Sequence, residues 1–71
     1  MIYFDGIHIV ADSLKELHEF AEKLNIRRCW YEGVRKGHPH YDSPNWAKNI
    51  VRANSKFVTS REVLKLSKLM K

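Results

Sequence analysis

The sequence predicts an α/β fold in one domain, residues 1–71. We expect a small three-stranded, mainly parallel sheet with three helices in the order β-α-β-α-β-α, a Rossmann-like layer. Short segments rich in β-branched and aromatic residues alternate with amphipathic segments of helical period. Each helical segment follows a good capping residue. Strands that alternate with helices favour parallel neighbours, because a parallel pair needs a crossover connection.

The first ten residues, MIYFDGIHIV, favour extended structure. The pair Asp5-Gly6 between apolar residues is typical of a hairpin, and it also fits a bend where a buried strand leaves the sheet. We expect the second arrangement, with one short strand from Ile2 to Phe4 and then an extended connection.

The first helix is expected to begin at Ser13, which can form a capping box with Glu16. Asn25 suits the left-handed conformation that ends a helix. Residues 26–32, IRRCWYE, are the predicted second strand, with Cys29 packed in it. The buried stripe of the helix repeats at helical spacing: Leu14, Leu17, Ala21 and Leu24.

The second helix is expected to run from Ser43, as N-cap, to about Asn54, since the proline after Ser43 fits the first helical position. Residues 56–59, KFVT, are the third predicted strand. Thr59 with Glu62 forms another capping box, and the last helix continues to the C-terminus. The buried side of the second helix should carry four apolar residues: Trp46, Ala47, Ile50 and Val51.

Charge and composition narrow the range of partners. The net charge is +5 and the isoelectric point about 9.6, which favours anionic partners such as a nucleotide, nucleic acid or an acidic protein surface. No apolar run approaches the roughly 20 residues of a membrane span, so no membrane partner is expected. With no secretory signal at the N-terminus and a single cysteine, Cys29, the cytoplasm is the expected location.

In a parallel sheet, each of the three helices would begin at the carboxyl edge. The helix starts at Ser13, Ser43 and Thr59 would then converge, and their free amides and dipoles would favour an anion there. A domain this small has little room for an enclosed cavity, so a shallow cleft or a homodimer interface is the expected form of the site.

The stretch HPHYDSPNW, residues 38–46, is the densest group of chemically active side chains. In an extended chain His38, His40 and Asp42 point the same way and could supply three metal ligands, whereas Tyr41 points oppositely. His18, beside the buried stripe of the first helix, would complete a candidate metal set with His40 and Asp42. The alternative is that Asp42 caps the helix, Tyr41 packs and the histidines are solvated.

The expected ligand-binding residues share a position near the carboxyl edge or in the basic loop. They are Asp12, His18, Arg35, Lys36, His40, Tyr41, Asp42 and Ser43. No spacing indicates a glycine-rich phosphate loop, a nucleophile elbow or any particular catalytic residue.

Four segments, HIVADSLKELHEFAEKL, CWYE, HYDSP and VTSREVL, together resemble a small bacterial and phage family catalogued as a domain of unknown function. The resemblance spans nearly the whole chain and implies a shared polar site without naming an activity. Two segments depart from it: the loop after the first strand is shortened to FDGI, and Asn54-Ser55 stands where the family has Gly-Ala. The family's signature falls on His8, Asp12, His18, Trp30, His40, Tyr41, Asp42, Ser60, Arg61 and Glu62.

These observations favour a small accessory protein, more a binding protein than an enzyme, that binds a phosphate-bearing ligand. The ligand would be a nucleotide or a nucleic-acid backbone, and the protein could serve to sequester a nucleotide signal, in the host cytoplasm if a phage encodes it. One alternative is a metal-assisted phosphodiester hydrolase, which needs a divalent metal; no other cofactor is expected. Another alternative is an inhibitor or adaptor that binds a host protein.

Overall fold

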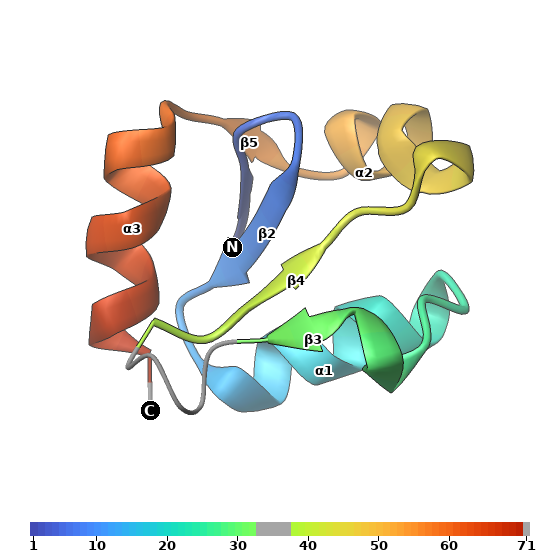
Figure 1. Cartoon of the computed structure of the whole chain (residues 1–71), viewed down its shortest axis with the longest axis horizontal. Coiled ribbons are helices and arrows are strands. Elements are labelled where there is room, and N and C mark those ends of the chain that lie inside the picture. The colour runs from blue at the N-terminus through green and yellow to red at the C-terminus, as the bar shows by residue number, and fades with distance from the viewer. Residues whose placement is uncertain (33–37, 71) are drawn as a thin grey trace.

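The computed structural model describes residues 1–32 and 38–70. Within these residues, five strands, three α-helices and two 3₁₀ turns follow one another, and Figure 1 shows their arrangement. The strands are β1 (Ile2–Phe4), β2 (His8–Ala11), β3 (Tyr31–Glu32), β4 (His40–Asp42) and β5 (Lys56–Phe57). The helices are α1 (Leu14–Lys23), α2 (Lys48–Ala53) and α3 (Ser60–Leu69), and the 3₁₀ turns are η1 (Arg28–Trp30) and η2 (Asn45–Ala47).

The sheet is mixed and mostly antiparallel, with strand order β3-β4-β2-β1-β5. Among the strands that the structure describes, β1 and β5 pair in parallel, and the other three pairs are antiparallel. The predicted three-stranded, mainly parallel sheet is therefore wrong. The segments of β2 and β4 were expected to be connections. Both are strands, and each of them pairs antiparallel with its neighbours in the sheet.

The turn at Asp5-Gly6 is the hairpin, not the bend we expected. β1 and β2 pair with Phe4 opposite Ile9, and the Asp5 amide donates to the His8 carbonyl at 3.3 Å. Gly6 has φ of +102°, a conformation that L side chains rarely adopt, so glycine suits this turn.

Two of the predicted helix starts are confirmed by their caps. The Ser13 hydroxyl accepts from the Glu16 amide at 3.1 Å, and the Thr59 hydroxyl accepts from the Glu62 amide at 3.2 Å. Asn25, the residue after the C-cap of α1, has φ of +59°, as its left-handed preference predicted.

The predicted strand at residues 26–32 contains the 3₁₀ turn η1, and only Tyr31–Glu32 pairs with the sheet. The cause is β4, which has only three residues and pairs with β3 at Tyr41 and His40. Without a ladder partner the preceding residues form η1, where Cys29 is exposed rather than packed.

The predicted helix start at Ser43 is also wrong. Pro44 is the residue before η2, no side chain caps that turn, and α2 begins only at Lys48. Ala47 and Val51 are buried as expected, whereas Trp46 is 63% exposed and Ile50 45% exposed. The tight 3₁₀ turn changes the helical phase, so the apolar residues fall on both sides.

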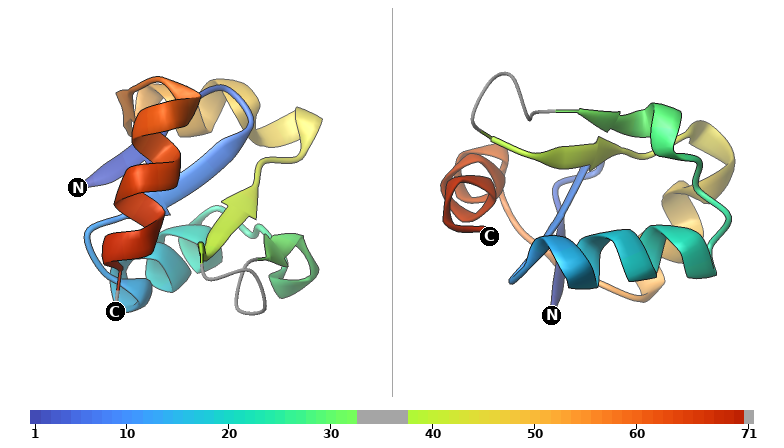
Figure 2. Two further views of the ribbon diagram at one scale, coloured as in Figure 1. Left: turned by 60° about the vertical axis from the view of Figure 1, so that its left-hand side comes forward. Right: turned by 90° about the horizontal axis from the view of Figure 1, so that it is seen from below.

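α1 and α3 lie on different sides of the central strands (Figure 2). The α1 residue His18 contacts Tyr41, and α3 borders a pocket with His8 and His40. The core between these layers is apolar and includes Phe4, Ile9, Val10, Leu17, Tyr41 and Val51. Within the described part of the chain, no helix is long and apolar enough to span a membrane.

The antiparallel pairing also separates the helix starts. β2 runs antiparallel to its neighbours β1 and β4. Because β5 is parallel to β1, β2 also runs opposite to β5. α1 follows β2, whereas α2 and α3 follow β4 and β5, so α1 begins at the opposite edge of the sheet from the other two. The expected convergence of three helix N-termini at one edge is therefore wrong.

Candidate functional site

The motif His40-Tyr41-Asp42 forms strand β4, and the strand divides its side chains between two faces. His40 and Asp42 point to the side that faces α3, and Tyr41 points to the side that faces α1. The sequence predicted this alternation correctly, but it placed the motif in a loop before a helix.

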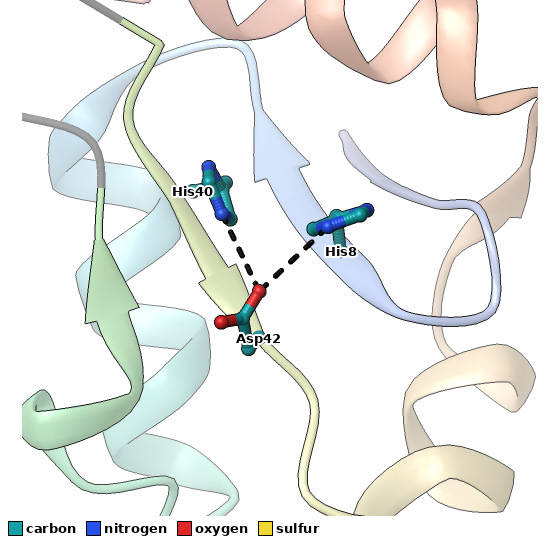
Figure 3. A group of neighbouring side chains, drawn as sticks. All are labelled: His8, His40 and Asp42. Carbon is teal, nitrogen blue, oxygen red and sulfur yellow. Dashed lines mark ion pairs between the residues drawn. The ribbon is translucent and has the colours of Figure 1, made fainter. Parts of the chain in front are cut away.

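The register of β2 against β4 brings a third polar residue to the first face. His8 is the cross-strand partner of Asp42, and its ring contacts that of His40 edge to face, with centroids 5.0 Å apart. Asp42 Oδ1 lies 3.3 Å from His40 Nε2 and 3.8 Å from His8 Nε2 (Figure 3). Within residues 1–32 and 38–70 this is the one group of three whose ligand atoms all lie within 4.8 Å.

These separations suit a metal ion. Ligands about 2.0–2.1 Å from a tetrahedral zinc ion lie roughly 3.3 Å from one another. The His40–Asp42 pair already has this separation, the His8–Asp42 pair is about 0.5 Å wider, and all three ligand atoms lie within 4.8 Å of one another, so a bound metal would draw them closer. His8 and Asp42 are each about one-third exposed, so further ligands can approach from solvent.

The other ring nitrogen of His8 is held by a buried carboxylate. Asp5 Oδ2 lies 2.9 Å from His8 Nδ1, and Asp5 Oδ1 accepts from the amides of Ile7 at 2.9 Å and His8 at 2.7 Å. The Asp5 side chain is 1% exposed. Burial by itself would raise the pKa of Asp5, but the hydrogen bonds from His8, Ile7 and Ser60 lower it to about 2, so the carboxylate is ionised.

The other ring nitrogen of His40 is also occupied. His40 Nδ1 lies 2.8 Å from the carbonyl oxygen of His38, and the His38 ring stacks on the His40 ring with centroids 5.6 Å apart. A carbonyl and a carboxylate only accept hydrogen bonds, so both Nδ1 atoms donate. In neutral His8 and His40 the Nε2 lone pairs then face the Asp42 carboxylate, an arrangement that a cation between them would stabilise.

On the opposite face, His18 belongs to an aromatic cluster. Its Nδ1 shares a 2.7 Å hydrogen bond with the Tyr41 hydroxyl, and its ring contacts that of Tyr31 at a centroid distance of 4.8 Å. Burial lowers the pKa of His18, and the positive charge of Arg28 lowers it further. Burial raises the pKa of Tyr41. The structure therefore places His18 across the sheet from His40 and Asp42 instead of beside them.

The remaining predicted residues lie elsewhere. The Asp12 carboxylate accepts from the Tyr3 hydroxyl at 3.0 Å and from the Met1 amino group at 3.2 Å, and these bonds lower its pKa. Ser43 is buried, and its amide donates to the Ile7 carbonyl at 2.7 Å, which joins β4 to the hairpin. Arg35 and Lys36 lie outside the described residues.

A small pocket borders the polar cluster. Its volume is about 180 Å³, and His8, His38 and His40 form one wall while Ser60, Val63, Leu64 and Ser67 of α3 form the other. The pocket is partly open to solvent, and its lining is mainly apolar.

Sequence reasoning did not include His8 among the expected ligand-binding residues, although His8 is part of the family signature, and it assigned no role in the site to Asp5. A hairpin at Asp5-Gly6 would have indicated the position of His8, because the residues after that turn form β2, which pairs with β4. Asp5 and His8 are three residues apart, the spacing at which a turn side chain reaches the backbone that follows it.

A family model described as "protein of unknown function (DUF4031)" matches residues 5–69. The chain belongs to the DUF4031 family. The predicted resemblance to a domain of unknown function is therefore confirmed, and the matched range includes Asp5, His8, His40 and Asp42. Neither a curated protein nor a solved structure matches the chain.

Proposed function

We propose that this member of the DUF4031 family binds a divalent metal ion of the zinc class through His8, His40 and Asp42, and that the metal acts on a phosphate-bearing ligand by hydrolysing a phosphate ester. The observation that carries the proposal is the convergence of two Nε2 lone pairs on one carboxylate oxygen. Two imidazoles and a carboxylate form the ligand set of several catalytic zinc sites, which keep a fourth position open for water or substrate.

A metal held in this way would polarise a phosphoryl oxygen and make bound water acidic near neutral pH. The hydrolysis consumes one water molecule. Its oxygen forms a bond to phosphorus, the ester P–O bond breaks, and the departing oxygen gains a proton. The partial exposure of His8 and Asp42 supports access for a substrate too large for the adjoining pocket.

The net charge of +5 supports a nucleotide or a nucleic acid as the ligand, because both carry negative phosphates. The single cysteine, Cys29, supports a reducing cytoplasmic setting. The helix N-termini do not converge, so they give no support to phosphate binding. The support comes instead from the candidate metal site, because a bound metal would attract a phosphate.

The test begins with metal-free protein titrated with Zn²⁺, Mn²⁺ and Mg²⁺ by calorimetry. We expect one equivalent of Zn²⁺ to bind, with Mg²⁺ much weaker because it prefers oxygen ligands. The loaded protein is then assayed on bis-(4-nitrophenyl) phosphate and on dinucleotides. Absence of zinc binding would remove the whole proposal, whereas binding without turnover on any phosphate ester would leave a metal-dependent binding protein.

Matched histidine variants give the sharper test. His8→Ala removes a ligand, whereas His18→Ala removes a histidine from the opposite face of the sheet. His38→Ala keeps the backbone carbonyl that His40 contacts. We expect loss of zinc binding in the first variant only, and equal loss in all three would show that the assignment of the ligands is wrong.

A further inference from the structure

We infer that Asp5 is the positioning residue of this metal site: its carboxylate fixes the His8 ring in the tautomer whose Nε2 is free to bind the metal. The inference rests on the proposed function and extends it to a residue that does not touch the metal. Asp5 is buried, and it lies at the hairpin turn that immediately precedes His8.

The two carboxylate oxygens of Asp5 have separate tasks. Oδ1 accepts two backbone amides, from Ile7 and His8, and this contact fixes the side chain in the turn. Oδ2 is thereby directed at His8 Nδ1, 2.9 Å away. A carboxylate can only accept, so the proton of the neutral ring stays on Nδ1 and the lone pair stays on Nε2, which faces Asp42.

Metal-bound histidines commonly donate their second N–H to a carboxylate or a carbonyl, which sets the tautomer and the ring orientation. Both partners occur here, since Asp5 holds His8 and the His38 carbonyl holds His40. A structural aspartate would need only the two amide contacts to stabilise the turn. The additional contact is the one from Asp5 Oδ2 to Nδ1, and Figure 3 shows that the second ring nitrogen of His8 points away from Asp42.

The substitution Asp5→Asn tests this role directly. The two amides require the carbonyl oxygen of the new side chain, so its NH₂ group must face His8 Nδ1. An NH₂ group only donates, and Nδ1 must then accept, which moves the ring proton to Nε2 and blocks the ligand. We expect zinc affinity to fall at least 10-fold to 100-fold, the usual effect of losing such a partner.

The experiment compares wild type, Asp5→Asn and the control Asp12→Asn in full-length protein. Asp12 is also a hydrogen-bonded aspartate, but it lies on the surface beside Met1 and Tyr3. Zinc affinity is measured by calorimetry, and thermal unfolding of the metal-free proteins monitors the fold. Reduced affinity in Asp5→Asn alone, with the fold retained, supports the inference, and wild-type affinity in Asp5→Asn overturns it.

A second measurement determines the tautomer of His8 directly in the wild-type protein. The ¹⁵N shifts and proton couplings of the His8 ring in metal-free wild type, at a pH where the ring is neutral, show which nitrogen carries hydrogen. We expect Nδ1–H, and Nε2–H would overturn the inference even if Asp5→Asn does not fold. If wild type binds no zinc while His8 is Nδ1–H, the proposed function fails and the tautomer assignment stands separately.

Discussion

His8 and Asp42 are direct cross-strand partners in the β2–β4 ladder, and this pairing assembles the polar cluster of the protein. His8 Nε2 lies 3.8 Å from Asp42 Oδ1, although the two residues are far apart in the sequence. The same register opposes Ile9 and Tyr41, whose side chains enter the other face. One strand pairing therefore separates a candidate metal site from an aromatic cluster, and each can be tested alone.

Asp42→Asn should weaken zinc binding while keeping the shape of the side chain. The neutral amide is a poor zinc ligand, and it removes the negative charge that faces His8 and His40. We expect a loss of affinity of more than about 10-fold, a magnitude typical of disrupted metal sites. Calorimetry with Zn²⁺ measures it, and an unchanged dissociation constant would exclude Asp42 as a ligand.

Zinc should stabilise the folded protein, because the three ligands converge only when β2 and β4 pair. At a free zinc concentration 100 times the dissociation constant, the free energy of unfolding should rise by about 2.7 kcal/mol. Scanning calorimetry with and without a chelator checks this at one pH. His8→Ala should show no such gain; a gain equal to that of wild type would place the zinc elsewhere.

Tyr41→Phe should cost about 1 kcal/mol of stability, since it removes the hydroxyl that bonds to His18 Nδ1 at 2.7 Å. It should leave zinc affinity within about twofold, because Tyr41 points to the face opposite its neighbours His40 and Asp42. Chemical denaturation measures the loss of stability, and zinc calorimetry measures the dissociation constant. A large loss of affinity with little loss of stability would contradict the separation of the two faces.

The stability of the metal-free protein should fall in acid partly through His18. Burial, and then Arg28, lower the pKa of His18 in the folded state below the ordinary value of 6.5, so the unfolded chain binds the proton more tightly. This contribution to stability is complete above about pH 6.5 and is lost as the pH falls toward the lower folded pKa.

The pH effect is isolated by comparing wild type with His18→Gln in a chelator. The free energy of unfolding is measured by denaturant titration between pH 7.5 and 5. The decrease on acidification should be smaller in His18→Gln, whose side chain does not titrate in this range. Identical decreases in both proteins would mean that His18 is as readily protonated in the folded protein as in the unfolded chain.

Gly6→Ala should destabilise the hairpin by about 1–2 kcal/mol, because φ of +102° is unfavourable for an L side chain. Steric overlap is not the cause, since a Cβ there would lie 3.9 Å from its nearest neighbour, Phe57. Urea denaturation measures the cost. A neutral effect would show that the turn relaxes to another conformation without disturbing β1 and β2.

The local signals of the sequence were sufficient for α1 and α3. Ser13, Thr59 and Asn25 act within a few residues of their own position, so the helix boundaries follow from caps and stops that need no tertiary contact. Likewise, the two-residue spacing of His40 and Asp42 placed them on a common face once the segment was extended.

The third member of the cluster, and the fold class with it, were decided by strand pairing. His8 reaches Asp42 through the β2–β4 register, and β5 lies beside β1 as a parallel neighbour. Such pairings join distant segments, and short strands carry little information about which partner they take. The sequence by itself therefore determined where α1 and α3 begin and that His40 and Asp42 share a face, whereas the tertiary structure decided that His8, and not His18, lies beside them.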